Sequence, residues 1–201
     1  MFDANIRPVI EPPLNALGRQ LAEMGVGANC LTVAGFALGL FGAAFIVFGE
    51  LWLALAAIML NRLADGLDGA VARATERTDF GGFLDIALDF IFYGSVPIAF
   101  ALNNPEVNAL PAAVLLSSYL ANGTAFLAYA VIAEKRELKN TAQGVKSIYY
   151  MSGLAEGGET IVTIFLFCLL PTFFAVIAYV FAALCYVSAA GRLLFAWHTL
   201  R

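Results

Sequence analysis

Six apolar stretches, each close to the length that crosses a bilayer, dominate this sequence of 201 residues. A helix needs about 20 apolar residues to span the hydrocarbon core of a membrane. We predict membrane helices near residues 31–49, 51 into 61–73, 82–102, 108–133, 152–170 and 172–197. Pro171 separates the last two, because proline interrupts a helix. The predicted fold class is therefore all-α, a polytopic membrane protein with six transmembrane helices.

The composition agrees with a membrane location. Hydrophobic residues make up 61% of the chain and charged residues 13%, whereas soluble domains have about half and about a quarter. This composition excludes disordered, collagen-like and coiled-coil chains. The net charge of −4 argues against a nucleic-acid partner. We expect a single membrane domain over residues 1–201, with residues 1–28 as a juxtamembrane segment.

The basic residues predict the orientation of the helices. With six spans, every Lys and Arg falls in or beside the N-terminal segment, the second-to-third connection, the fourth-to-fifth connection or the C-terminus. The other connections contain no basic residue. Because basic connections stay in the cytoplasm, both termini and the active site are expected there. The compact size favours a prokaryotic inner membrane.

A short apolar face follows Pro13. Leu14, Leu17, Leu21 and Met24 recur at helical spacing, which is typical of an amphipathic helix. We expect this helix to lie in the interface of the cytoplasmic leaflet, in contact with membrane lipids. The alternative is a solvated helix that packs against the protein's own surface.

Four aspartates lie where the second and third predicted spans reach the cytoplasmic side. Asp65 and Asp68 are three residues apart, and Asp85 and Asp89 are four apart, so each pair shares one helical face. The short turn at 74–80 makes the helices antiparallel neighbours, and the two pairs can face each other. Four converging carboxylates repel and are costly to desolvate. Two divalent ions, Mg²⁺ or Mn²⁺, would balance the four charges.

The surroundings of these acids indicate a ligand that carries phosphate. Gly66, Gly69, Gly81 and Gly82 flank the acids and leave room for a bulky group. Arg73 adds a positive charge nearby. In such a two-metal site the ions neutralise a pyrophosphate, and one carboxylate can act as the base for an attacking hydroxyl.

Two other interpretations of the four acids remain open. The first is a pair of helices joined by salt bridges from Arg62, Arg73 and Arg77. The second is an ion or proton pathway, because acids within membrane spans often line transport routes.

The acid region also carries a family resemblance. The pattern Asp65-x2-Asp68-Gly69-x2-Ala72-Arg73-x7-Gly81-x3-Asp85-x3-Asp89 resembles the signature of the CDP-alcohol phosphatidyltransferases. The length and six-span layout are similar to the membrane domain of that family. The family often has eight residues between the arginine and the second glycine, and this chain has seven, a difference that falls in the cytoplasmic turn.

The resemblance implies roles for individual residues. Asp65, Asp68 and Asp85 would bind two divalent ions, and Asp89 would be both a metal ligand and the catalytic base. The residues implied to contact the CDP group are Gly69, Ala72, Arg73, Thr78 and Gly81, together with Asn29 and Thr32 at the start of the first span. The resemblance also implies a homodimer.

The predicted reaction follows from these roles. The tails of CDP-diacylglycerol lie in the bilayer, Asp89 takes a proton from an acceptor hydroxyl, and the phosphatidyl group moves to that hydroxyl as CMP leaves. A CDP-choline or CDP-ethanolamine phosphotransferase that acts on diacylglycerol shares the signature and is an alternative. A prenyltransferase and a non-enzymatic transporter are further alternatives.

Residues outside the signature are expected to select the acceptor, a small polar alcohol. Lys146 and Arg192 flank predicted spans and suit a phosphorylated acceptor such as glycerol 3-phosphate or an inositol phosphate. Alternatively, the basic connection contacts anionic lipids. Glu156 and Glu159 could order Lys146 or hold a cationic acceptor.

Overall fold

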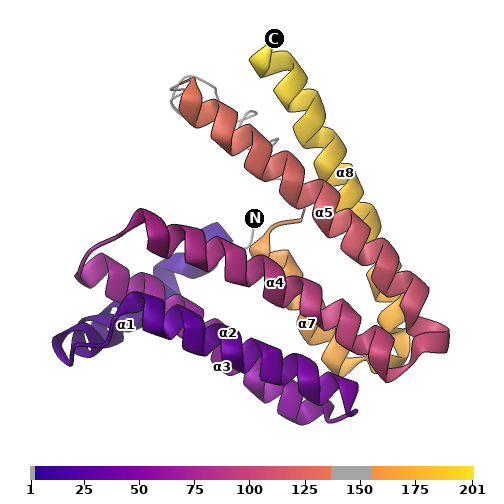
Figure 1. Cartoon of the computed structure of the whole chain (residues 1–201), viewed down its shortest axis with the longest axis horizontal. Helices are drawn as coiled ribbons and strands as arrows, with labels where there is room; N and C mark the ends of the chain where they lie inside the picture. Colours follow the sequence, from indigo (N-terminus) through magenta and orange to yellow (C-terminus); the bar gives the residue numbers. More distant parts are fainter. Residues whose placement is uncertain (1–2, 137–154) are drawn as a thin grey trace. The chain divides into compact units, whose positions relative to one another are not determined.

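The computed structural model describes residues 3–136 and 155–201, and the side chains from residue 11 onward within those ranges. Every element of the described chain is helical (Figure 1). In chain order these are α1 (Asp3–Glu23), α2 (Ala28–Val47), α3 (Leu51–Ala74), α4 (Asp79–Asn103), α5 (Pro105–Lys135), α7 (Gly157–Leu169), the short 3-10 helix η1 (Pro171–Phe173) and α8 (Phe174–Leu200). They form two compact units, Phe2–Glu106 and Val107–Arg201.

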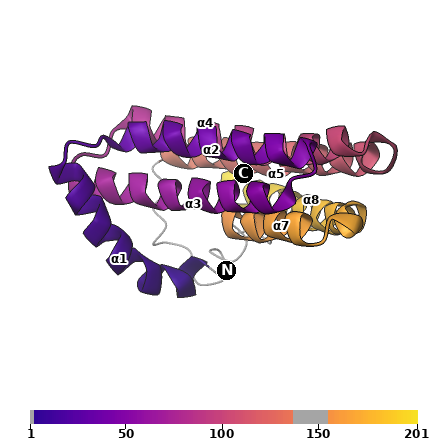
Figure 2. The ribbon, with the colours of Figure 1, turned by 90° about the horizontal axis from the view of Figure 1, so that it is seen from below.

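In the first unit, α2 packs against both α3 and α4. Small residues allow the close approach: a Cβ at Gly35 would lie 2.9 Å from Ala64 Cβ, and one at Gly39 would lie 2.7 Å from the Phe92 ring. Figure 2 shows α2, α3 and α4 with nearly aligned axes and α1 at an angle to them. Small residues at helix contacts are typical of membrane proteins. This packing fixes the relative positions of α3 and α4, which carry the aspartates.

The connections within this unit are short. Gly49, with φ of 79°, adopts the left-handed conformation that glycine permits, and it turns the chain from α2 into α3. Between α3 and α4, Thr78 caps the new helix, because its Oγ1 accepts a hydrogen bond from Gly81 N at 3.0 Å. The expected turn between the two aspartate pairs is therefore confirmed.

The N-terminal helix α1 packs on α3. A Cβ at the buried Gly18 would lie 2.6 Å from Ala70 Cβ, and one at Gly66 would lie 3.0 Å from the Leu14 side chain. Leu17 and Met24 are exposed, so only part of the predicted apolar face is used. The helix begins at Asp3, eleven residues before Leu14, the first residue of the predicted apolar face. Its location in the membrane interface stays a prediction.

In the part of the chain that the structure describes, four segments are long and apolar enough to cross a membrane: α2, α4, α5 and the stretch Pro171–Leu200. They coincide with the first, third, fourth and sixth predicted spans. Helix α3 has the expected position but contains the acidic and basic residues of the site, and α7 has only 13 residues. The chain is a membrane protein, and the break at Pro171 is confirmed, because η1 begins there. The count of six spans stays a prediction.

The second unit is built from α5, α7 and α8. Between α5 and α8, Tyr186 donates a hydrogen bond to Ser117 Oγ at 2.9 Å, and Arg136 donates one to the Leu200 carbonyl at 2.7 Å. Phe167 of α7 packs on Phe174 of α8, with ring centroids 4.7 Å apart. These contacts join the helices that carry the predicted acceptor residues.

Candidate active site

Three carboxylates converge in the first unit. One oxygen from each of Asp65, Asp68 and Asp85 lies within 4.8 Å of the others. Asp65 and Asp68 share one face of α3, and Asp85 comes from the first turns of α4. The predicted meeting of the two helices at their acidic ends is therefore present for three of the four aspartates.

The cluster fits a divalent cation. Asp68 is buried, and its Oδ2 has no hydrogen-bond partner among the residues that the structure describes. A buried carboxylate oxygen without a donor is energetically costly. Carboxylate oxygens are the ligands that Mg²⁺ and Mn²⁺ prefer. Asp65, Asp68 and Asp85 could therefore hold such an ion.

The fourth aspartate lies beside this cluster. Asp89 Oδ1 accepts a hydrogen bond from Arg62 Nη2 at 2.8 Å, and Asp89 Oδ2 accepts one from the Tyr93 hydroxyl at 2.8 Å. Arg62 Nη1 also lies 3.5 Å from Asp65 Oδ2. Both oxygens of Asp89 are thus engaged by protein donors, and Arg62 links Asp89 to the cluster.

Sequence reasoning considered Arg62 only as a salt-bridge partner in the packing alternative, and it missed Tyr93 and Asn61. Arg62 Nε donates to Asn61 Oδ1 at 2.7 Å. The spacing offered a signal, since Arg62 precedes Asp65 by three residues and Tyr93 follows Asp89 by four. Each of these pairs lies on one helical face.

Two adjoining cavities meet at the cluster. The smaller is lined by all four aspartates and by Arg62, Asn61 and Thr32, among others. The larger is a groove of about 640 Å³, including space open to solvent. Every residue predicted to contact the CDP group lines this groove: Asn29, Thr32, Gly69, Ala72, Arg73, Thr78 and Gly81. Asp68, Asp85 and Thr32 line both cavities, so two of the three clustered aspartates line the groove itself.

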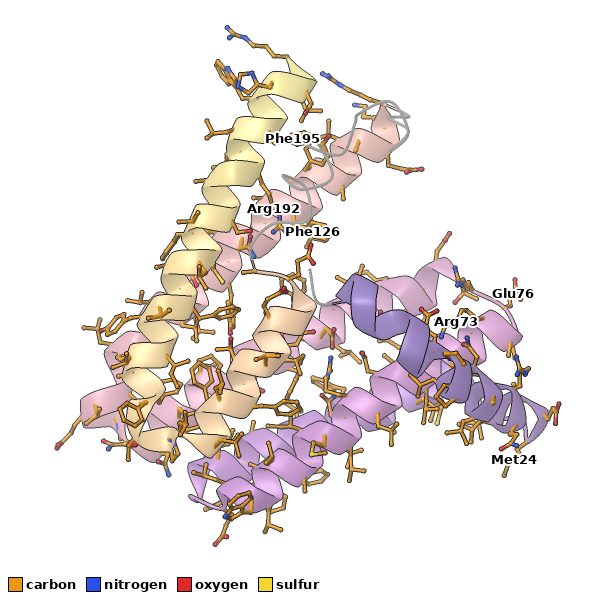
Figure 3. The ribbon with its side chains drawn as sticks, turned by 180° about the vertical axis from the view of Figure 1, so that it is seen from behind. Met24, Arg73, Glu76, Phe126, Arg192 and Phe195 are labelled. Carbon is orange, nitrogen blue, oxygen red and sulfur yellow. The ribbon has the colours of Figure 1, made fainter. Side chains whose placement is uncertain are left out.

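One residue of the groove, Arg73, is held by a helix outside the signature. Arg73 Nε donates to Asn15 Oδ1 of α1 at 3.0 Å. A Cβ at Gly69 would approach Arg73 Nη1 to 3.3 Å, so the glycine leaves the arginine room. Glu76 and Arg77 also line the groove, and Figure 3 shows Arg73 and Glu76 near each other at the end of α3. Sequence reasoning missed Glu76 as a groove residue and Asn15 as the partner of Arg73.

Of the predicted acceptor residues, Arg192 has the clearest setting, in the second unit. Its side chain is buried, and Nη1 donates to Asn122 Oδ1 at 2.6 Å and to the Asn122 carbonyl at 3.2 Å. Its guanidinium carbon lies 5.1 Å from the centroid of the Phe126 ring (Figure 3). The Nε of Arg192 is buried without a hydrogen-bond partner in the described part of the chain.

The other predicted acceptor residues differ in setting. Glu156 and Glu159 form a capping box at the start of α7, in which Glu159 accepts a hydrogen bond from Glu156 N at 3.2 Å. This arrangement gives both carboxylates a structural role. Glu156 also interacts electrostatically with Arg192. Lys146 lies outside the described residues.

Comparison with known proteins identifies the family. The family model for CDP-alcohol phosphatidyltransferase matches residues 26–198, nearly the whole chain. The chain belongs to this family. A CDP-alcohol phosphatidyltransferase is a transferase of substituted phosphate groups, so the chain is an enzyme. The matched region spans both compact units.

Proteins from bacteria and archaea resemble the chain over most of its length. The inner membrane protein YnjF of Escherichia coli K12 is 45% identical and covers all of this chain and 98% of its own. An archaetidylinositol phosphate synthase of Pyrococcus horikoshii is 30% identical over 81% of this chain and 80% of its own.

A solved structure shares the fold. The crystal structure of Mycobacterium tuberculosis phosphatidylinositol phosphate synthase (PgsA1) with CDP-DAG bound aligns with a TM-score of 0.70 and 22% sequence identity. The alignment covers 92% of this chain and 93% of that one. The helical arrangement is therefore one already seen in a solved enzyme structure.

Proposed function

We propose that this enzyme transfers a phosphatidyl group from CDP-diacylglycerol to the hydroxyl of a small polar alcohol and releases CMP. The observation that carries the proposal is that two of the clustered aspartates, Asp68 and Asp85, line the same groove as all seven predicted CDP contacts. The solved relative is described with CDP-DAG bound, which supports the same donor here.

Asp65, Asp68 and Asp85 would hold two divalent ions, Mg²⁺ or Mn²⁺. When bound, such ions neutralise the diphosphate and stabilise the departing CMP. The orphaned Asp68 Oδ2 supports this assignment, since it lacks a protein donor in the described chain. Asp89 is the fourth proposed ligand, and each of its oxygens, which also accepts one hydrogen bond from Arg62 or Tyr93, keeps a second lone pair for an ion.

The groove residues and Asp89 have separate proposed roles. Gly69, Arg73 and the other groove residues bind the CDP group, and Asn15 orients Arg73. Asp89 accepts the proton of the acceptor hydroxyl. The hydroxyl oxygen then forms a bond to the β-phosphorus. The bond from that phosphorus to the CMP oxygen breaks, and CMP leaves with the electron pair.

The acceptor is proposed to carry a phosphate. Arg192 is a buried cation with an unpartnered N–H among the described residues, and arginine suits phosphate recognition. Two more polar atoms are buried without partners in the described chain: the Tyr119 hydroxyl of α5 and Ser188 Oγ of α8, the helix that also carries Arg192. The Pyrococcus relative is named for an inositol phosphate product, which favours a phosphorylated polyol. Lys146, Glu156 and Glu159 remain candidate contacts.

The cellular setting is part of the proposal. We assign six membrane spans in one domain, an N-terminal helix in the lipid interface, and cytoplasmic termini and active site, on the distribution of basic residues. The Escherichia coli relative is named as an inner membrane protein, which favours that membrane for this chain. A homodimer is the expected assembly.

The test uses the purified full-length protein with CDP-diacylglycerol and Mg²⁺ or Mn²⁺. Acceptors are glycerol 3-phosphate, inositol 1-phosphate, and the unphosphorylated glycerol and inositol. We expect CMP release with a phosphorylated acceptor, and its loss on metal chelation. A parallel reaction with CDP-ethanolamine and diacylglycerol examines the other donor class. CMP release only in that parallel reaction, or in none, overturns the proposal.

A further inference from the structure

Arg62 is a basic residue placed among four acids. Among the described residues that line the smaller cavity, it is the only cation, together with Asp65, Asp68, Asp85 and Asp89. Its contact with Asp89 is close, at 2.8 Å, and its contact with Asp65 is looser, at 3.5 Å. Arg62 lies outside the signature pattern that defines the metal and CDP residues, so its role needs a separate explanation.

The guanidinium of Arg62 is held on several sides. Its Nε donates to Asn61 Oδ1, and Asn61 Nδ2 in turn donates to the Gly35 carbonyl of α2 at 2.8 Å. Its carbon lies 5.1 Å from the Phe92 ring centroid, within the range of a cation–π contact. Because the planar fork is fixed before any ligand arrives, little entropy is lost in holding a carboxylate.

Tyr93 holds the other oxygen of the same carboxylate. Its hydroxyl donates to Asp89 Oδ2 at 2.8 Å, and Arg62 Nη1 lies 3.4 Å from that hydroxyl. One donor comes from α3 and the other from α4, so together they fix both the position and the rotation of the Asp89 carboxylate. The contact between Arg62 and the three-aspartate cluster is looser, since its Nη1 lies 3.5 Å from Asp65 Oδ2.

We propose that Arg62 and Tyr93 are positioning residues, which fix the orientation of the Asp89 carboxylate and so keep it aligned for the acceptor hydroxyl. The inference rests on the proposed function, in which Asp89 is the base. Without Arg62, Asp89 faces three acids with no compensating charge, and its carboxylate turns away from them. The proton acceptor then leaves its place while the CDP groove stays intact.

The test compares Arg62→Gln, Arg62→Lys and Tyr93→Phe with the wild type, using full-length protein and the acceptor that releases CMP most rapidly. We expect kcat to fall roughly 100-fold for Arg62→Gln, with the lysine variant intermediate, since a positioned base contributes about 10²–10⁴-fold. Tyr93→Phe loses one hydrogen bond to a charged group and is expected to lose about tenfold in kcat. The KM for CDP-diacylglycerol stays near the wild-type value in all three.

Controls separate positioning from folding. Arg19→Gln and Tyr179→Phe remove the same groups from exposed sites, and both should retain wild-type kcat. Added guanidinium should restore part of the turnover of Arg62→Ala but none of that of Asp89→Asn. If Arg62→Gln does not fold, the near-isosteric Tyr93→Phe variant alone tests whether the two residues position Asp89.

Two results would overturn the inference. One is wild-type kcat in both Arg62→Gln and Tyr93→Phe. The other is a parallel loss of donor binding and turnover in Tyr93→Phe, which would make the network a general structural support. If the wild type releases no CMP, the proposed function itself is wrong. If the wild type is active and Asp89→Asn is inactive, the proposed function holds, and the Arg62 and Tyr93 variants then test only this inference.

Discussion

Two arginines in apolar helices have similar immediate surroundings but different remaining partners. Arg62 bonds to an asparagine side chain at 2.7 Å and lies 5.1 Å from a phenylalanine ring, and Arg192 bonds to an asparagine side chain at 2.6 Å and lies 5.1 Å from another phenylalanine ring. Arg62 also forms a short ion pair with Asp89. Arg192 instead keeps a buried Nε with no hydrogen-bond partner in the described chain.

The comparison distinguishes a side chain that positions another residue, such as Arg62, from one that, within the described chain, has a free donor for a ligand, such as Arg192. A satisfied pair such as Arg62 and Asp89 holds its own geometry, whereas a buried polar atom without a partner has a free-energy cost that a ligand can remove. The orphan in the first unit is an acceptor, Asp68 Oδ2, which suits a cation. In the second unit the Tyr119 hydroxyl and Ser188 Oγ are also unpartnered among the described residues, and the charged group of the three is a donor, Arg192 Nε, which suits an anion.

The largest loss of activity is expected when the unpartnered acceptor, Asp68 Oδ2, is removed. Asp68→Asn takes a negative charge from the cluster and places an amide where an ion should bind. We predict that CMP release falls by about 1,000-fold or more, since metal-assisted charge stabilisation supplies several kcal/mol. Steady-state assays over a range of Mn²⁺ concentrations measure this loss. Asp79→Asn is the matched control at the start of α4, and near-normal activity of Asp68→Asn would contradict the cation assignment.

A smaller and more selective effect, on acceptor binding, is expected when the unpartnered donor, Arg192 Nε, is removed. Arg192→Gln should raise the KM for a phosphorylated acceptor by about 10- to 100-fold, since a hydrogen bond to a charged group is worth about 1.5–3 kcal/mol. The KM for CDP-diacylglycerol should not change. Arg201→Lys, at the exposed C-terminus, serves as the control. An equal rise for glycerol and for glycerol 3-phosphate would show that Arg192 does not recognise phosphate.

The smallest effect is expected at the edge of the groove. Asn15→Ala removes the hydrogen bond to Arg73 Nε, so Arg73 remains present but is less ordered. We predict a rise of about two- to fivefold in the KM for CDP-diacylglycerol, consistent with about 0.5–1 kcal/mol for an exposed hydrogen bond. The exposed Gln20→Ala in the same helix should have no effect. A change in kcat alone would place Asn15 in a different role.

Much of the site could be predicted because it follows helical periodicity. The spacing of Asp65, Asp68 and Asp85 across a short turn predicts their convergence, and the structure confirms it. The groove around Gly69 and Gly81 is lined by every residue that the family resemblance implies as a CDP contact. The break at Pro171 also follows from local chemistry alone.

Other features depend on tertiary contacts that periodicity does not encode. The pattern puts Asp89 on the face of Asp85, but packing of α4 beside Arg62 and Tyr93 decides that its oxygens bond to them. The bond between Asn15 and Arg73 joins residues 58 positions apart and depends on where α1 packs. By contrast, the three-residue spacing of Glu156 and Glu159 is the signature of a capping box, and the sequence could have revealed it.

The central claim is that Asp89 acts in turnover and the groove acts in donor binding. Asp89→Asn and wild-type protein should therefore be compared in one preparation, by CDP-diacylglycerol binding and by CMP release with the preferred acceptor. The account predicts that the variant binds the donor with nearly wild-type affinity and releases CMP at least about 1,000-fold more slowly, within the range of a lost general base. Equal losses of binding and turnover, or an active variant, would contradict it.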